Sequence, residues 1–326
     1  MTWDERVKAI ADHGFTERQA GFLVTVMLHS GVCLGRHYSD FARITHGQKV
    51  QDFFQKLTAR KYVTARRCGH NTARLFHVHH KPLYEAIGEP DNRHRRPLSL
   101  SRAVERLMVL DAVLGDRDLQ WLATEREKVA HFTTSRRVPL GDLPSLTFSS
   151  EAGQTVRRFA DKLPIGISAD GRTYVFLYLA TRPLPADFRM FLERHAELMR
   201  ALPEWCVRVL LPHHLSNATN RYREAFREQV GTALRPTQLQ ELRWFFETRR
   251  SGTGKQEDER FDRAKRAFGT PRFRVLYRAW LEQGDRVLDA VVSPTLTTAI
   301  ARQTGKFEAR ILAHRYLHLA PLAGTA

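Results

Sequence analysis

Between residues 36 and 80, the spacing of the apolar residues changes from a helical to an alternating pattern. In the segment 47–63 the apolar residues recur at i, i+3, i+4 and i+7, the spacing of one buried helical face. Two runs rich in β-branched and aromatic residues follow at 62–67 and 72–79, and residues 68–71 between them are good turn formers. The sequence therefore predicts an amphipathic helix followed by a hairpin. The apolar stripe of this helix consists of Val50, Phe53, Phe54 and Leu57.

Two further helices are expected before the amphipathic one. Thr16 and Gln19 have the spacing of a capping box, which marks the start of a helix, and Gly31 marks its end. A second, short helix is expected over residues 36–44, and residues 45–47 form the turn to the amphipathic helix. The order is thus helix, short helix, turn, amphipathic helix and hairpin.

The polar face of the amphipathic helix carries side chains that suit DNA bases. With about 3.6 residues per turn, its amides and its one carboxyl group point away from the apolar stripe. A glutamine can pair with adenine, and an aspartate can accept a hydrogen bond from cytosine. The candidate base-reading residues are Gln48, Gln51, Asp52 and Gln55.

Positive charge surrounds the same helix. Residues 41–80 contain eight basic residues and one acidic residue, a net charge of 8 − 1 = +7. Such a density of charge is expected to contact phosphates. The candidate phosphate-binding residues are Lys49, Lys56, Arg60, Arg66, Arg67 and Arg74. Over residues 1–88, about a quarter of the chain, the pattern resembles the winged helix-turn-helix superfamily. That resemblance implies a helix placed in the major groove of double-stranded DNA.

The composition of the whole chain agrees with a nucleic-acid partner. The 326 residues, 42% of them hydrophobic, are enough for two or three domains, and the formal charge of +17 indicates a polyanionic partner. No apolar run approaches the ~20 residues that span a bilayer, and the first ten residues lack the pattern of a signal peptide. Three widely spaced cysteines, Cys33, Cys68 and Cys206, are expected to be free thiols in a cytoplasmic protein.

The middle of the chain predicts a mixed α/β domain. Residues 89–153 read as a linker and a helical segment, with a helix at 116–131 and a surface connection at 133–153. Residues 154–230 follow as a domain with strands at 154–168, 173–180 and 206–212, and helices at 185–202 and 217–230. This order resembles the core of restriction-endonuclease-like nucleases.

The sequence has the order of elements of those nucleases but lacks their catalytic residues. The strand at 173–180 contains no acid and no lysine, although Mg²⁺ needs carboxylates. Asp170 lies in the turn before it, and Glu193 and Glu197 lie on the next helix. We therefore expect a degenerate core that serves either assembly as a homodimer or contact with DNA. A winged helix joined to such a core resembles the replication-relaxation proteins of plasmids and integrative elements.

The last third, residues 231–326, is expected to be basic and helical. Arginines and lysines alternate with aromatic residues over 260–280, a composition that can hold single-stranded nucleic acid. An ordinary amphipathic helix pair with a charged outer face explains the same residues.

The overall expectation is an α+β, sequence-specific double-stranded DNA-binding protein, either a transcriptional regulator or an accessory factor of a mobile element, without a cofactor. The alternative is a metal-dependent enzyme that nicks or cleaves DNA. For this alternative, His77 and His79 could hold an ion next to Tyr84, and Asp170 could be a ligand. A zinc site is the other possibility, but one cysteine matches it poorly. Its candidate ligands are Cys68, His70, His77, His79 and His80.

Overall fold

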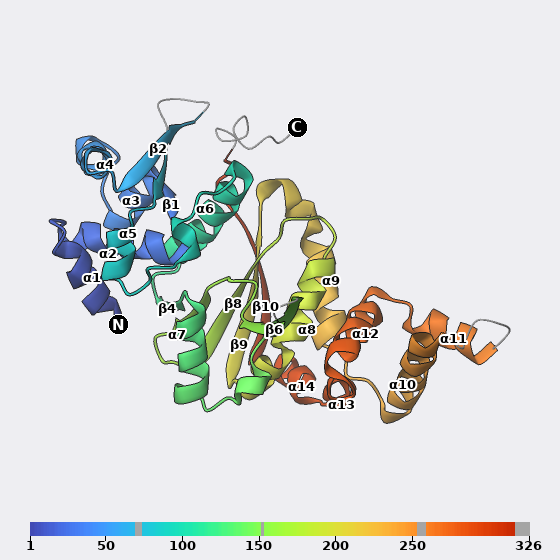
Figure 1. The fold of residues 1–326 in the computed structure, drawn as a ribbon. Coiled ribbons are helices and arrows are strands. Elements are labelled where there is room, and N and C mark those ends of the chain that lie inside the picture. Colours follow the sequence, from blue (N-terminus) through green and yellow to red (C-terminus); the bar gives the residue numbers. More distant parts are fainter. Residues whose placement is uncertain (69–73, 151–152, 253–258, 317–326) are drawn as a thin grey trace. The chain divides into compact units, whose positions relative to one another are not determined.

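The computed structural model describes residues 1–68, 74–150, 153–252 and 259–316 (Figure 1). Residues 69–71, which are most of the expected hairpin turn and include the candidate zinc ligand His70, lie outside these ranges. The chain divides into two compact units, Met1–Thr124 with Leu312–Ala326, and Glu125–Ile311. The first unit therefore extends past residue 88 and includes residues from the far end of the chain.

The first unit combines helices with a small antiparallel sheet (Figure 1). Its sheet has the strand order β1-β3-β2, with Cys33 opposite Phe76 and Ala65 opposite the same residue from the other side. The elements are α1 (Trp3–Ala11), α2 (Glu17–His29), β1 (Val32–Leu34), α3 (Gly35–Ala42), α4 (Gln48–Ala59), β2 (Val63–Arg67), β3 (Arg74–Val78), α5 (Lys81–Ala86), η1 (Arg93–Arg95), α6 (Leu100–Gly115) and β4 (Leu119–Leu122).

The expected start of α2 is confirmed. Thr16 accepts a hydrogen bond from the Gln19 backbone N–H, and the Gln19 side chain accepts one from the Thr16 N–H. α2 is buried on nearly all sides and forms the centre of the core, since its apolar residues pack against α1, α3, α4 and the sheet. After α2, Gly31 takes a φ of +72° against the backbone of His94. A Cβ at this glycine would lie 2.4 Å from the His94 carbonyl oxygen, so only glycine fits.

The second unit contains a mixed sheet with helices packed on it. Its elements are α7 (Glu125–Ala130), η2 (His131–Ser135), η3 (Leu140–Asp142), β5 (Ser145–Ser150), β6 (Gly153–Arg158), β7 (Ile165–Ser168), β8 (Thr173–Leu179), α8 (Ala186–Ala201), β9 (Glu204–Leu211), η4 (His213–Ala218), α9 (Thr219–Val230), α10 (Pro236–Ser251), α11 (Glu259–Phe268), α12 (Pro271–Gln283), α13 (Arg286–Val292), α14 (Thr295–Ala301) and β10 (Gly305–Ile311).

Parallel and antiparallel pairs both occur in this sheet. β7 and β8 are antiparallel around the predicted turn at Asp170 and Gly171, whereas β8, β9 and β10 run parallel. Tyr178 on β8 contacts Phe188 and Phe191 of α8, so that helix covers one face of the sheet. The expected α+β class with a mixed central sheet is confirmed.

Four expectations about individual segments are wrong. Residues 159–164 belong to no strand, so the single strand expected at 154–168 is instead two strands, β6 and β7. Residues 119–122 form strand β4 inside the expected helix 116–131, and residues 145–150 form β5 inside the expected surface connection. Residues 305–311 form β10 in a region expected to be helical, and this strand pairs with β9 about a hundred residues earlier in the chain. Phe307 and Ala309 of β10 alternate with charged residues, a short pattern that gains stability only from its distant partner.

The three cysteines are unpaired, as expected. Among the described residues, no helix has both the length and the apolar composition of a membrane span.

Candidate nucleic-acid interface

The amphipathic helix α4 packs by its apolar stripe as the sequence predicts. Val50, Phe53 and Leu57 are at most 1% exposed, and Phe54 is 4% exposed. The Phe53 ring lies 4.3 Å from Tyr38 of α3, and the Phe54 ring stacks on Phe76 of β3 at 4.0 Å. The stripe therefore joins α4 to α3 on one side and to the hairpin on the other.

All four candidate base-reading residues are exposed on the opposite face of α4. The Gln48 side-chain amide donates to the Asp52 carboxylate at 2.6 Å, so these two side chains hold each other one turn apart. The side-chain amides of Gln51 and Gln55, also one turn apart, have no hydrogen-bond partner in the described part of the chain. Their amides are thus available to an external ligand.

The candidate phosphate-binding residues fall into two groups. Arg66, Arg67 and Arg74 are exposed at the far end of the hairpin, where Arg67 pairs in register with Arg74. Among the residues that the structure describes, none of these three guanidinium groups forms an ion pair. Lys49 is also exposed, in the first turn of α4.

Lys56 and Arg60 instead contact the turn after α1. The Lys56 ammonium donates to the Gly14 carbonyl, and the Arg60 guanidinium donates to the His13 carbonyl at 2.6 Å. Both cations also lie over the Phe15 ring, at 5.0 and 5.7 Å from its centroid. These two residues stabilise the position of the C-terminal half of α4, a role that the sequence did not reveal.

An open groove runs along one flank of α4. It has a volume of about 850 Å³ and lies between α4 and residues of α1, α2 and α3. Lys49, Asp52 and Lys56 line it from α4, and Trp3, Tyr38 and Phe41 contribute aromatic surface. This flank of the helix is therefore not covered by another element of the first unit.

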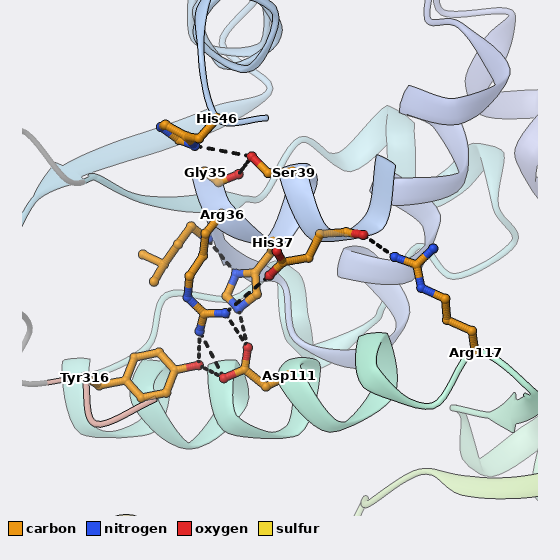
Figure 2. Close-up of polar contacts among 10 residues, drawn as sticks. Gly35, Arg36, His37, Ser39, His46, Asp111, Arg117 and Tyr316 are labelled. Atoms are coloured by element: carbon orange, nitrogen blue, oxygen red, sulfur yellow. Dashed lines mark hydrogen bonds and ion pairs between the residues drawn. The ribbon is translucent and has the colours of Figure 1, made fainter. Parts of the chain in front are cut away.

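The turn between α3 and α4 depends on close packing at Gly35 (Figure 2). The Ser39 hydroxyl lies 3.3 Å from His46 Nδ1, and a Cβ at Gly35 would lie 2.8 Å from the His46 ring. Arg43 ends α3 in the left-handed region at φ +53°, with its N–H donating to the Ser39 carbonyl. The start of α4 is thus fixed relative to α3.

A charged network anchors α3 from its other side (Figure 2). Arg36 of α3 donates to both carboxylate oxygens of Asp111 on α6, at 2.7 and 3.0 Å. His37 accepts a bond from the Leu34 N–H at Nδ1, so its Nε2 carries the proton that it donates to Asp111 at 3.0 Å. The Tyr316 hydroxyl accepts from Arg36 at 2.8 Å and donates to Asp111.

The electrostatics of this network keep Asp111 ionised. Burial alone would raise the pKa of Asp111, but the hydrogen bonds from His37 and Arg36 hold it well below its usual range. Burial and the Asp111 charge raise the pKa of Tyr316, and burial lowers that of His37. Sequence analysis missed this network because its members, at positions 36, 37, 111 and 316, share no local pattern.

The residues considered for nicking chemistry serve structural purposes in the first unit. His77 Nε2 donates to the His94 carbonyl at 2.9 Å, and the fully buried Tyr84 hydroxyl donates to the Val78 carbonyl at 3.1 Å. His79 lies next to His77, with 5.8 Å between ring centroids. A tyrosine with a buried, bonded hydroxyl is not placed to attack a phosphodiester.

The acids considered in the second unit do not converge on one point. Asp170 accepts from Ser168 and from the Arg172 N–H within its own turn, and Glu193 accepts from Gln229 on α9 at 2.7 Å. Burial raises the pKa of Glu193. Glu197 accepts from Arg200. In the described ranges of the chain, no three His, Cys, Asp or Glu residues are grouped to hold a metal ion.

Comparison of the chain with models of protein families, with curated proteins and with solved structures finds no match.

Proposed function

We propose that this protein binds double-stranded DNA at specific sequences through α4, as a transcriptional regulator or an accessory factor of a mobile element. In this proposal α3 and α4 are the helix-turn-helix, and β2 and β3 are the wing. The observation that carries it is the exposed amide face of α4. The side-chain amides of Gln51 and Gln55 have no hydrogen bond within the described chain, and exposed arginines lie on the adjoining hairpin.

The division of roles follows from the chemistry of the two groups. Gln51 and Gln55 reach base edges in the major groove, where a glutamine can bind adenine through two hydrogen bonds. Arg66, Arg67 and Arg74 bind phosphates, which add affinity without sequence preference. Lys56 and Arg60 act indirectly, because their contacts with residues 13–15 set the angle of α4.

The test begins with selection of bound duplexes from a random pool by the full-length chain. We expect Gln51→Ala/Gln55→Ala to lower the preference for the selected site over a scrambled duplex by roughly 10- to 100-fold. Arg66→Ala/Arg67→Ala should weaken both duplexes equally and reduce the slope of log K against log salt by about 2.

Gln240→Ala/Gln283→Ala, which removes two exposed amides from the second unit, is the matched control and should change neither quantity. The proposal fails if the α4 pair keeps full preference for the selected site. We further propose that the chain binds as a homodimer. Two copies would contact two half-sites about one helical turn apart, so the selected sites should contain an inverted repeat.

A further inference from the structure

A second basic surface lies in the second unit, where α11 meets α12. An open groove of about 560 Å³ follows the turn between these helices. Three cationic side chains and one carboxylate line it, together with the two turn residues. The lining residues are Asp262, Lys265, Arg266, Gly269, Thr270 and Arg274.

Helical periodicity places these cations on the solvent side. On α11, Lys265 and Arg266 are exposed, whereas Ala264 and Phe268 are buried. On α12, the exposed Arg274 lies opposite a core-facing stripe that includes Leu276 and Trp280. The aromatic residues of this region therefore belong to the core, and the basic residues form a separate outer surface.

The groove cations differ from neighbouring arginines in their partners. Arg260 forms two bonds to Glu241, and Arg243 forms an ion pair with Asp285. Lys265, Arg266 and Arg274 have no ion pair with any described carboxylate. Within the described residues, the Arg274 guanidinium donates one hydrogen bond, from Nε to the Gly269 carbonyl. Three cations that have no ion pair within the described residues, beside the one carboxylate that lines the groove, are complementary to a polyanion.

No aromatic residue is among the described residues that line the groove, and arginines already lie over two aromatic rings of this unit. The Arg260 guanidinium lies 3.8 Å from the Trp244 ring centroid, and Arg249 lies 4.5 Å from that of Tyr277. Single-stranded nucleic acid binds strongly where aromatic faces accept its bases. Cations without such platforms suit the phosphates of a duplex.

We propose that the α11–α12 groove binds the phosphodiester backbone of duplex DNA without regard to sequence. This contact is separate from the role proposed for α4 and does not depend on it. In a chain that holds DNA at both places, the second contact increases the overall affinity through a high effective concentration.

The experiment measures binding of the full-length chain to a labelled 30-base-pair duplex of random sequence, and to a single strand of the same length, over a range of salt concentrations. We expect Lys265→Ala/Arg266→Ala/Arg274→Ala to weaken duplex binding at least about tenfold near 100 mM salt. The slope of log K against log salt should fall by about 2 to 3, the value for three lost phosphate contacts.

Two comparisons separate a local site from overall charge. Arg221→Ala/Arg227→Ala/Arg302→Ala removes three exposed arginines elsewhere in the second unit and should leave the slope within about 1 of the unchanged chain. The charge-conserving Lys265→Arg/Arg266→Lys/Arg274→Lys should keep full binding, and an unchanged melting temperature of the alanine triple would exclude a folding defect as the cause of its loss.

Equal losses of duplex affinity in the two alanine triples would overturn the proposal. Tighter binding of the single strand than of the duplex, if it depended on Lys265, Arg266 and Arg274, would also overturn it. Failure of the α4 proposal is distinguishable, because Gln51→Ala/Gln55→Ala is expected to alter sequence preference and not the binding of the random duplex.

Discussion

Two histidines of the first unit, His37 and His94, are buried and uncharged. Burial, together with the positive charges of Arg93 and Arg106, lowers the pKa of His94 well below its ordinary value. His37 uses its Nδ1 lone pair to accept the Leu34 N–H, so protonation there would break a buried hydrogen bond. Both residues therefore favour the folded chain only while they remain neutral.

This arrangement predicts loss of stability in mild acid. Below pH ~6.5 the unfolded chain binds protons at these histidines, whereas the folded chain does not. The contribution of the neutral histidines to the free energy of unfolding is therefore fully present above that pH and decreases as the pH falls. Each such histidine contributes about 1.4 kcal/mol per pH unit below its unfolded pKa. Thermal unfolding at pH 7.5 and 5.5 measures the effect, and His94→Gln should flatten the dependence. A melting temperature that is unchanged or higher at pH 5.5 would contradict the assignment.

For single residues, exposure could be predicted from the sequence, but tertiary contacts could not. The exposure of Gln51 and Gln55 could be predicted, because the apolar stripe of α4 alone decides which side chains face outward. The contacts of Lys56 and Arg60 could not, since they depend on how the turn at residues 13–15 folds back onto α4. Periodicity gives the face of a residue but not its tertiary partner.

At the level of elements, the Asp111 network joins α3, α6 and the segment 312–316. Its position beside α3 allows it to stabilise the element that carries the turn into α4 (Figure 2). Among the described residues of this segment, Tyr316 bonds both Asp111 and Arg36 through its hydroxyl. It therefore offers a precise point for testing the network.

We expect Tyr316→Phe to lower the free energy of unfolding of the chain by about 1.5–3 kcal/mol, because a buried carboxylate loses a hydrogen-bond donor. Urea denaturation measures the change. Tyr277→Phe removes a hydroxyl that has no hydrogen bond within the described residues and is the matched control. Equal stability of the two variants would show that the network contributes nothing measurable.

Elements with strong local patterns were predicted well, and elements that depend on distant pairing were not. Local sequence alone determines three of these features, because each depends on residues close together in the chain: the capping box of α2, the apolar stripe of α4 and the hairpin of β7 and β8. β10 is a seven-residue strand whose place is set by β9, and its sequence alone does not distinguish it from its helical surroundings.

At the scale of the whole molecule, the chain consists of two compact units, and each carries one of the proposed DNA contacts. The net charge of +17 indicated a polyanionic partner but could not locate the contacts. The structure separates cations that have internal ion-pair partners, such as Arg36 and Arg260, from those that have none among the described residues, such as Arg66 and Lys265. That separation, which sequence analysis could not make, supports the phosphate contacts in both proposals.

The central claim is that amides on α4 contact base edges in the major groove. The most direct test replaces each adenine of the selected duplex singly by 7-deaza-adenine, which lacks the N7 acceptor that a glutamine side chain contacts. We expect at least one position to weaken binding of the unchanged chain by roughly tenfold, and the same position to have no effect on Gln51→Ala/Gln55→Ala. If every substitution is tolerated, or if the loss is equally large in the variant, α4 does not read the DNA through these residues.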